Sequence, residues 1–138
     1  MLQRIQSILL LISSIALWGL FAIPFATGQE NANNMFADEV MNLNDHIGLL
    51  IICILGGVLS LVAIFFFKNR KLQATISYLS FIMAMALGGL AYGLFSSTGE
   101  GTLNFGMGLP LVSAIMSFLA AIFIKKDEKL VKSMDRLR

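Results

Sequence analysis

The side chains that most often bind metals or move protons gather at one point of this sequence. His46 is the only histidine of the 138 residues and directly follows Asp45, with Asp38 and Glu39 a few positions earlier. An imidazole beside carboxylates suits a divalent metal or a proton relay. A solvated histidine at the start of a helix gives the same composition, and one histidine with scattered carboxylates is a weak metal signature. We therefore assign no metal site and no cofactor.

Nucleophilic side chains are present, but the groups that would activate them are missing. A serine nucleophile needs a base, and His46 is the only conventional one. Cys53, the single cysteine, has no basic residue near it in sequence to favour a thiolate. We therefore expect no enzymatic activity and no catalytic residue. The serines of the apolar stretches are better explained as partners of helix backbones and neighbouring helices: Ser7, Ser13, Ser14, Ser60, Ser77, Ser80, Ser113 and Ser117.

The chain around these residues is too apolar for a soluble domain, with 57% hydrophobic and 13% charged residues. A helix crosses a hydrocarbon core of roughly 30 Å with about 20 residues. Four stretches of that length contain no Asp, Glu, Lys, Arg or His: 5–26, 47–67, 72–95 and 103–124. The first is too long for the apolar part of a signal peptide, so we expect an uncleaved span. The prediction is an all-α integral membrane four-helix bundle, forming one domain over residues 1–138.

The basic residues give this bundle an orientation. All ten lysines and arginines lie before the first stretch, in the connection 68–71, or after the fourth stretch. The charged residues of the connections 27–46 and 96–102 are all acidic. By the positive-inside rule, both termini are cytoplasmic. The net charge of +2 therefore reflects membrane orientation, and we expect no nucleic-acid partner.

Three local patterns refine the ends of the spans. Phe36, Val40 and Leu43 stand at helical spacing and predict a short amphipathic helix in the outer connection, which either caps the bundle or binds a partner. Asn44 is placed to cap the helix of the second stretch. If the fourth helix begins at Pro110, we expect it to continue into the C-terminal tail.

Small residues repeat at four-residue spacing along three of the stretches. Such rows let helix backbones approach closely in lipid. We expect them to pack within the bundle, and a dedicated oligomer interface is the alternative. The helix-packing residues are Gly56, Ser60, Ala84, Gly88, Gly89, Gly93, Ser113, Ser117 and Ala121.

The segment 125–138 is the most regular polar part of the chain. It holds six basic and three acidic residues, and Glu128 and Lys132 are spaced for an ion pair along a helix. Its apolar residues form one helical stripe: Leu130, Val131, Met134 and Leu137. We predict a cytoplasmic amphipathic C-terminal helix, and its simplest role is an interfacial anchor.

Both ends of the chain resemble those of a known family. The opening MLQRIQS and the closing KKDEKLVKSMDRLR look like the ends of an uncharacterised bacterial four-span family, domain of unknown function 4293. The spans are similar mainly in hydrophobic pattern. The resemblance implies a small multi-pass protein of the bacterial inner membrane. It brings no known activity, cofactor or catalytic residue.

These two ends share the cytoplasmic side and define a candidate surface. We expect the N-terminal polar residues to meet the acids of the tail, either as a docking surface for a larger membrane or cytoplasmic assembly, or as a clamp between the first and fourth helices. The residues of this surface are Gln3, Arg4, Gln6, Asp127, Glu128, Lys129, Lys132, Asp135, Arg136 and Arg138.

The apolar interior limits the classes of function. Ion-coupled transporters need ionisable groups within the membrane, and small four-span multidrug carriers depend on a buried carboxylate that this chain lacks. We therefore expect a non-enzymatic accessory or scaffold subunit in the lipid bilayer, with other membrane or cytoplasmic proteins as partners. The alternative is a small transport or lipid-handling component that works only as an oligomer.

Overall fold

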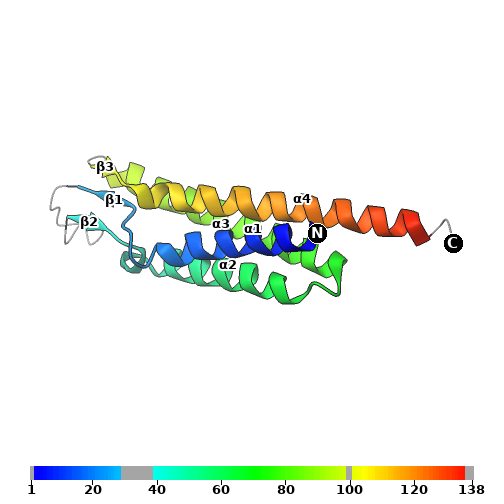
Figure 1. The fold of residues 1–138 in the computed structure, drawn as a ribbon. Coiled ribbons are helices and arrows are strands. Elements are labelled where there is room, and N and C mark those ends of the chain that lie inside the picture. Colours follow the sequence, from blue (N-terminus) through cyan, green and yellow to red (C-terminus); the bar gives the residue numbers. More distant parts are fainter. Residues whose placement is uncertain (1, 29–38, 99–100, 136–138) are drawn as a thin grey trace.

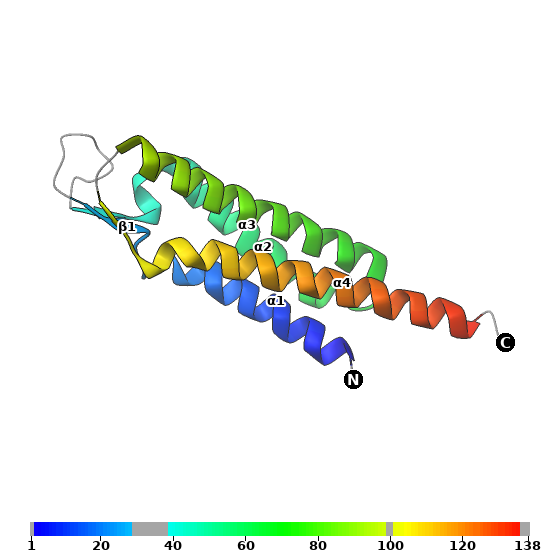
Figure 2. The ribbon, with the colours of Figure 1, turned by 90° about the horizontal axis from the view of Figure 1, so that it is seen from above.

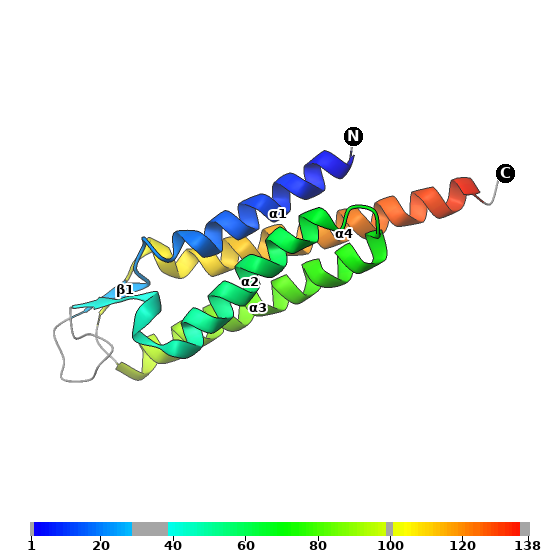
Figure 3. The ribbon, with the colours of Figure 1, turned by 90° about the horizontal axis from the view of Figure 1, so that it is seen from below.

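The computed structural model describes residues 2–28, 39–98 and 101–135 and is all-helical apart from one small sheet (Figure 1). The four long helices are α1 (Leu2–Gly19), α2 (Ile47–Phe65), α3 (Arg70–Thr98) and α4 (Leu109–Asp135). Each packs against two neighbours, in the ring order α1, α2, α3, α4. The sheet closes one end of the bundle, called the sheet end below, while α1 begins and α4 finishes toward the other, called the tail end (Figures 2 and 3).

Large apolar side chains cover the outside of this bundle, and small ones fill much of its inside. Ile15, Ile82 and Ile115 are about half exposed, whereas Ala63, Ala91 and many serines are fully buried. Such a distribution suits a bundle surrounded by lipid. Within the described residues, α2, α3 and α4 are long and apolar enough to cross a membrane, and the apolar part of α1, Ile5–Gly19, is shorter. An all-helical fold whose helices include three that are long and apolar enough to cross a membrane agrees with the prediction at this level.

The first helix ends earlier than the predicted stretch 5–26. It finishes at Gly19, and the chain turns with the amide of Ile23 donating to the carbonyl of Gly19 (3.1 Å). The next residue, Pro24, disfavours helical geometry in the residue before it and has no amide hydrogen to continue a helix. Phe25 is fully buried after this turn, so the chain closes the end of the bundle where a helix was expected.

A three-stranded sheet replaces the predicted amphipathic helix at the outer connection. Its strands are β1 (Ala26–Thr27), β2 (Val40–Met41) and β3 (Thr102–Leu103), in the order β2-β1-β3 and antiparallel. Val40 thus lies in a strand, Leu43 lies buried in the short 3-10 helix Leu43–Asp45, and Phe36 lies outside the described residues. The central strand β1 pairs with β2 along one edge and with β3 along the other, and so joins the segments before α2 and before α4. A helix has no free backbone edges to form such pairs.

The fourth helix begins at Leu109 and not at residue 103, and Pro110 occupies its first turn. Proline is tolerated there because first-turn amides have no partner within the helix. A 3-10 helix, η2 (Phe105–Gly108), leads into it. The helix continues unbroken to Asp135, so the predicted tail helix is the end of α4 and extends past the other helices (Figure 2).

Packing at the sheet end predicts that substitution of Gly106 destabilises the protein and that substitution of the nearby Gly108 does not. An added Cβ at Gly106 would lie 2.7 Å from the carbonyl carbon of Pro24, whereas one at Gly108 would meet no atom within 4 Å. We expect Gly106→Ala to reduce the free energy of unfolding by about 1–3 kcal/mol, because the contact is with backbone that cannot rotate away. Gly108→Ala is the matched control and should be neutral. Reversible unfolding in mixed detergent micelles measures both, and equal stabilities would contradict this packing.

Candidate functional site

Five serines form a hydrogen-bonded cluster in the middle of the bundle. Ser13 of α1 has its hydroxyl oxygen 2.7 Å from that of Ser117, 2.8 Å from that of Ser113 and 3.1 Å from that of Ser60. Ser80 of α3 completes the cluster, 2.6 Å from Ser60 and 3.3 Å from Ser117. All five side chains are fully buried. Each of the four helices therefore contributes at least one hydroxyl to a shared polar contact.

The hydroxyls of this cluster bond one another and one backbone carbonyl. The hydroxyl of Ser80 also donates to the carbonyl of Gly56 (3.3 Å). Nearby, the hydroxyl of Ser14 donates to the carbonyl of Gly57 (3.3 Å), and the thiol of Cys53 to that of Leu17 (3.1 Å). Hydroxyls can both donate and accept, so such a closed set satisfies itself without a charged group. The cluster therefore joins the four helices to one another by hydrogen bonds.

The rows of small residues fall into two groups. An added Cβ at Gly56 would lie 3.0 Å from a methyl carbon of Leu17, and one at Gly88 would lie 3.4 Å from the Cβ of Pro110. Ala84 and Ala121 are also buried. In contrast, Gly89 and Gly93 leave open space at the Cβ position and do not pack within the bundle. Their face of α3 points outward, so the spacing of four residues alone overstates the packed surface.

His46 acts as a helix cap in this structure. Its Nδ1 accepts a hydrogen bond from the amide of Gly48 (3.1 Å), which makes it the N-cap of α2 in place of the predicted Asn44. Asp45 accepts instead from the amide of Asn42 (2.5 Å). No three His, Cys, Asp or Glu side chains of the described residues come together as a metal site. Asp38 lies outside the described residues.

The charged residues of the tail end are paired differently from the sequence hypothesis. Asp127 binds Arg70, the first residue of α3, with 3.2 Å between the guanidinium nitrogen and the carboxylate oxygen. The same nitrogen donates to the backbone carbonyl of Asp127 (3.4 Å). Both side chains are largely shielded from solvent. The clamp seen here thus joins α3 to α4, where the sequence suggested a clamp between α1 and α4.

Of the N-terminal members of the predicted surface, only Gln6 has its side chain within the described part of the structure. Gln6 is 2% exposed, and its side-chain nitrogen has no hydrogen-bond partner among the described residues. It is an interior residue, because apolar side chains such as Ile5 and Ile8 occupy the exposed face of α1 and leave Gln6 facing the bundle. Gln3 and Arg4 lie in α1, but their side chains are outside the described part of the structure.

The described tail members lie on the last turns of α4, which run past the start of α3 and end beyond the other helices (Figure 3). Lys132 donates to Glu128 at 2.7 Å, the pair predicted from their spacing, and Lys129 is exposed. The pKa of Glu128 lies below its usual range, first because of this hydrogen bond and then because of the positive charges of Lys132, Lys71 and Lys125. Asp135 ends the helix with its side chain outside the description, and Arg136 and Arg138 lie outside the described residues.

Arg70 is the residue that sequence reasoning missed. In the sequence alone it stands out only as one of the basic residues that orient the chain. The short connection between α2 and α3 and the antiparallel run of α3 and α4 place the start of α3 beside the end of the apolar part of α4. An antiparallel α3 and α4 place the first residue of α3 near the end of the apolar part of α4, where Asp127 is the first acid. This alignment could have linked Arg70 to Asp127 from the sequence.

Comparison with known proteins identifies one relationship. The family model described as domain of unknown function (DUF4293) matches residues 2–137. No curated protein matches the chain significantly, and neither does any solved structure. The match covers all four helices and the sheet.

The serine cluster predicts that replacing a buried serine destabilises the protein more than replacing an exposed one. Replacing Ser13 by Ala removes the hydroxyl that contacts three other serines. We expect a loss of about 1–2 kcal/mol in the free energy of unfolding, since hydroxyls left in the interior lose a partner that lipid cannot replace. Ser97→Ala is the control, because this exposed serine donates only to the carbonyl of Leu94 in its own helix. If both variants unfold alike in micelles, the cluster does not hold the helices together.

The α3–α4 ion pair predicts a second, smaller effect. We expect Asp127→Asn to lower the free energy of unfolding by about 1 kcal/mol, because the partly shielded Arg70 loses its counter-charge. Asp127→Asn should cost less when Arg70 is already replaced by Gln than when Arg70 is present. A double-mutant cycle measures this difference as a coupling energy. Glu128→Gln, which breaks the exposed pair with Lys132, should cost less than Asp127→Asn. A zero coupling energy would rule out the clamp.

Proposed function

Because the chain belongs to the family described as domain of unknown function (DUF4293), we propose a function from its own geometry: a four-span protein of a bacterial inner membrane that serves as an accessory or scaffold subunit. Its cytoplasmic end docks a larger assembly. Both termini are cytoplasmic in this proposal, as an even number of spans requires. The role needs no chemistry in the interior, where the described buried residues are apolar or uncharged polar.

The packing of α1 supports counting it as the fourth span. Its apolar part is shorter than those of the other helices, but α1 contacts α2 and α4 along the bundle. Its Ser13 bonds Ser60 of α2 and Ser117 of α4, and these two serines in turn bond Ser80 of α3. The turn after Gly19 continues toward the sheet end with internal hydrogen bonds. Irregular backbone is tolerated at membrane depth where protein buries it. A helix in this position would be surrounded by the same lipid as its neighbours.

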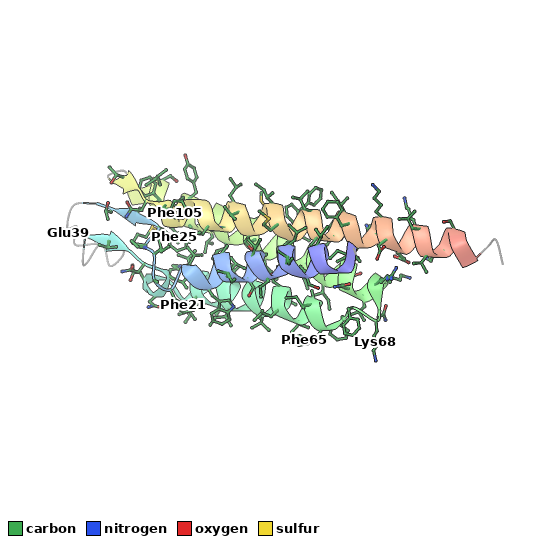
Figure 4. All side chains as sticks on the ribbon, in the orientation of Figure 1. Phe21, Phe25, Glu39, Phe65, Lys68 and Phe105 are labelled. Atoms are coloured by element: carbon green, nitrogen blue, oxygen red, sulfur yellow. The ribbon has the colours of Figure 1, made fainter. Side chains whose placement is uncertain are left out.

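The distribution of charge supports the orientation. Figure 4 shows Lys68 at the tail end and Glu39 at the sheet end. The other described lysines lie at the tail end with Lys68, on the first turn of α3 and on α4 beyond its apolar part. The positive-inside rule then makes the tail end cytoplasmic.

The projecting end of α4 carries the docking proposal. From Asp127 to Asp135 the helix extends about 12 Å at roughly 1.5 Å per residue, and Leu130 and Val131 are 47% and 37% exposed on it. A helix that continues a membrane span leaves the bilayer along the bundle axis, which carries these apolar side chains away from the hydrocarbon core and toward water. Exposed apolar residues among charges are typical of a protein contact. This geometry favours docking over the interfacial anchor.

The test places a photoreactive benzoyl-phenylalanine at Leu130 of the full chain in its native membrane. We expect irradiation to give a discrete protein adduct, because the proposed partner covers this side chain. The matched control places the same residue at Leu111, which is 58% exposed at the other end of α4 and should give lipid adducts only. Mass spectrometry identifies the adducts. If Leu130 also yields lipid adducts alone, the tail lies on the membrane and the docking proposal fails.

A further inference from the structure

A basic pocket lies between α3 and α4 at the tail end. Its volume is about 350 Å³, in the range of small-molecule sites. Four of its eight lining residues are lysines contributed by both helices, and a tyrosine lies among them. The lining consists of Lys71, Ala74, Thr75, Tyr78, Lys125, Glu128, Lys129 and Lys132.

The lining carries positive charge that the described residues do not neutralise. Glu128 is its only acid, and the ion pair with Lys132 occupies that carboxylate. Lys71, Lys125 and Lys129 are in no ion pair among the described residues. Ammonium groups gathered around one cavity repel each other, and the single carboxylate of Glu128 offsets only part of the charge of four lysines. The pocket therefore has the charge of an anion site, with three lysines available to a ligand.

The pocket also has the position of a lipid-headgroup site. Lys125 lies over the ring of Tyr78, with its nitrogen 4.3 Å from the ring centroid. Lysine and tyrosine are residues of the membrane interface, where the ring remains in the apolar layer and the charge reaches the headgroups. Side chains on a helix lean toward its N-terminus, so Lys129 on α4 leans back toward the membrane and the pocket.

An aromatic row continues from the pocket toward the membrane centre. The ring of Phe118 lies 6.3 Å from that of Tyr78 and 5.2 Å from that of Phe81. Phe118 is 41% exposed, so this row forms part of the outer surface between α3 and α4. A charged pocket above an exposed apolar row matches the two parts of a phospholipid, a headgroup and its acyl chains.

We propose that the pocket between α3 and α4 binds the phosphate headgroup of an anionic phospholipid, with Lys71, Lys125 and Lys129 around the phosphate. The acyl chains lie along Tyr78 and Phe118. Basic pockets between membrane helices on the cytoplasmic side bind anionic headgroups by this combination of charge and depth. The lipid belongs to the cytoplasmic leaflet, which rests on the orientation proposed above. Binding itself requires neither that orientation nor a protein partner.

The test is native mass spectrometry of the purified full chain in detergent with phosphatidylglycerol or phosphatidylethanolamine. We expect Lys71→Gln with Lys125→Gln to lower the association constant for phosphatidylglycerol about tenfold or more, since each base contributes to holding the anion. Lys68→Gln with Lys126→Gln is the matched control, because both lysines are exposed at the same end but do not line the pocket. It removes the same charge and should change binding by less than about twofold.

Two further arms complete the test. Lys71→Arg with Lys125→Arg keeps the charge and should retain binding, which separates loss of the site from loss of the fold. Added glycerol phosphate should not displace the lipid, because it lacks the acyl chains that contact the aromatic row. Equal effects of the pocket and control pairs, equal binding of both lipids, or displacement by glycerol phosphate would overturn the proposal. Since the isolated protein is measured, failure of the docking proposal leaves the result unaffected.

Discussion

The buried serine cluster is the contact on which the arrangement of the four helices depends. In lipid, hydrophobicity does not drive helices together, so close packing and polar contacts must do so. Ser13 reaches three other serines across the bundle, and Ser80 closes the set from α3. A shift of any helix by one turn, about 5.4 Å, would leave hydroxyls in an apolar interior without partners. The cluster therefore sets the register of the helices as well as their proximity.

That register has consequences at both ends of the bundle. At the tail end it places Arg70 beside Asp127, which ties the start of α3 to α4 where the latter leaves the bundle. At the sheet end, the amide of Phe25 donates to the carbonyl of Met41, and the amide of Asn104 donates to the carbonyl of Phe25 (both 2.9 Å). The sheet thus supplies hydrogen-bond partners to the backbone groups of the segments that connect the helices. Irregular connections would leave such groups without partners inside the protein.

Sequence patterns predicted the helices better than their ends. Long apolar runs indicated α2 and α3 to within a few residues, because nothing local competes with a helix there. The end of α1 at Gly19 and the strand at Val40 depended on contacts with distant segments, which periodicity does not contain. For the candidate surface, spacing along one helix predicted the Glu128–Lys132 pair. The burial of Gln6 depended on which face of α1 meets the bundle, so a polar residue was placed outside when it lies inside.

The positive-inside rule accounts for the sign of the charge at the tail end but not for its local arrangement. Orientation alone would be satisfied by basic residues anywhere beyond the spans. Instead, Arg70 is held by Asp127, and Lys132 is held by Glu128. Lys71 and Lys125 stand on facing helices around one cavity, and Glu128, the only acid of its lining, is bound to Lys132. Like charges on two packed helices cost free energy unless an anion shares them. The division between paired and unpaired cations is therefore the feature of this end that supports the proposed lipid site, while the exposed Leu130 and Val131 of the same stretch of α4 support the proposed protein contact.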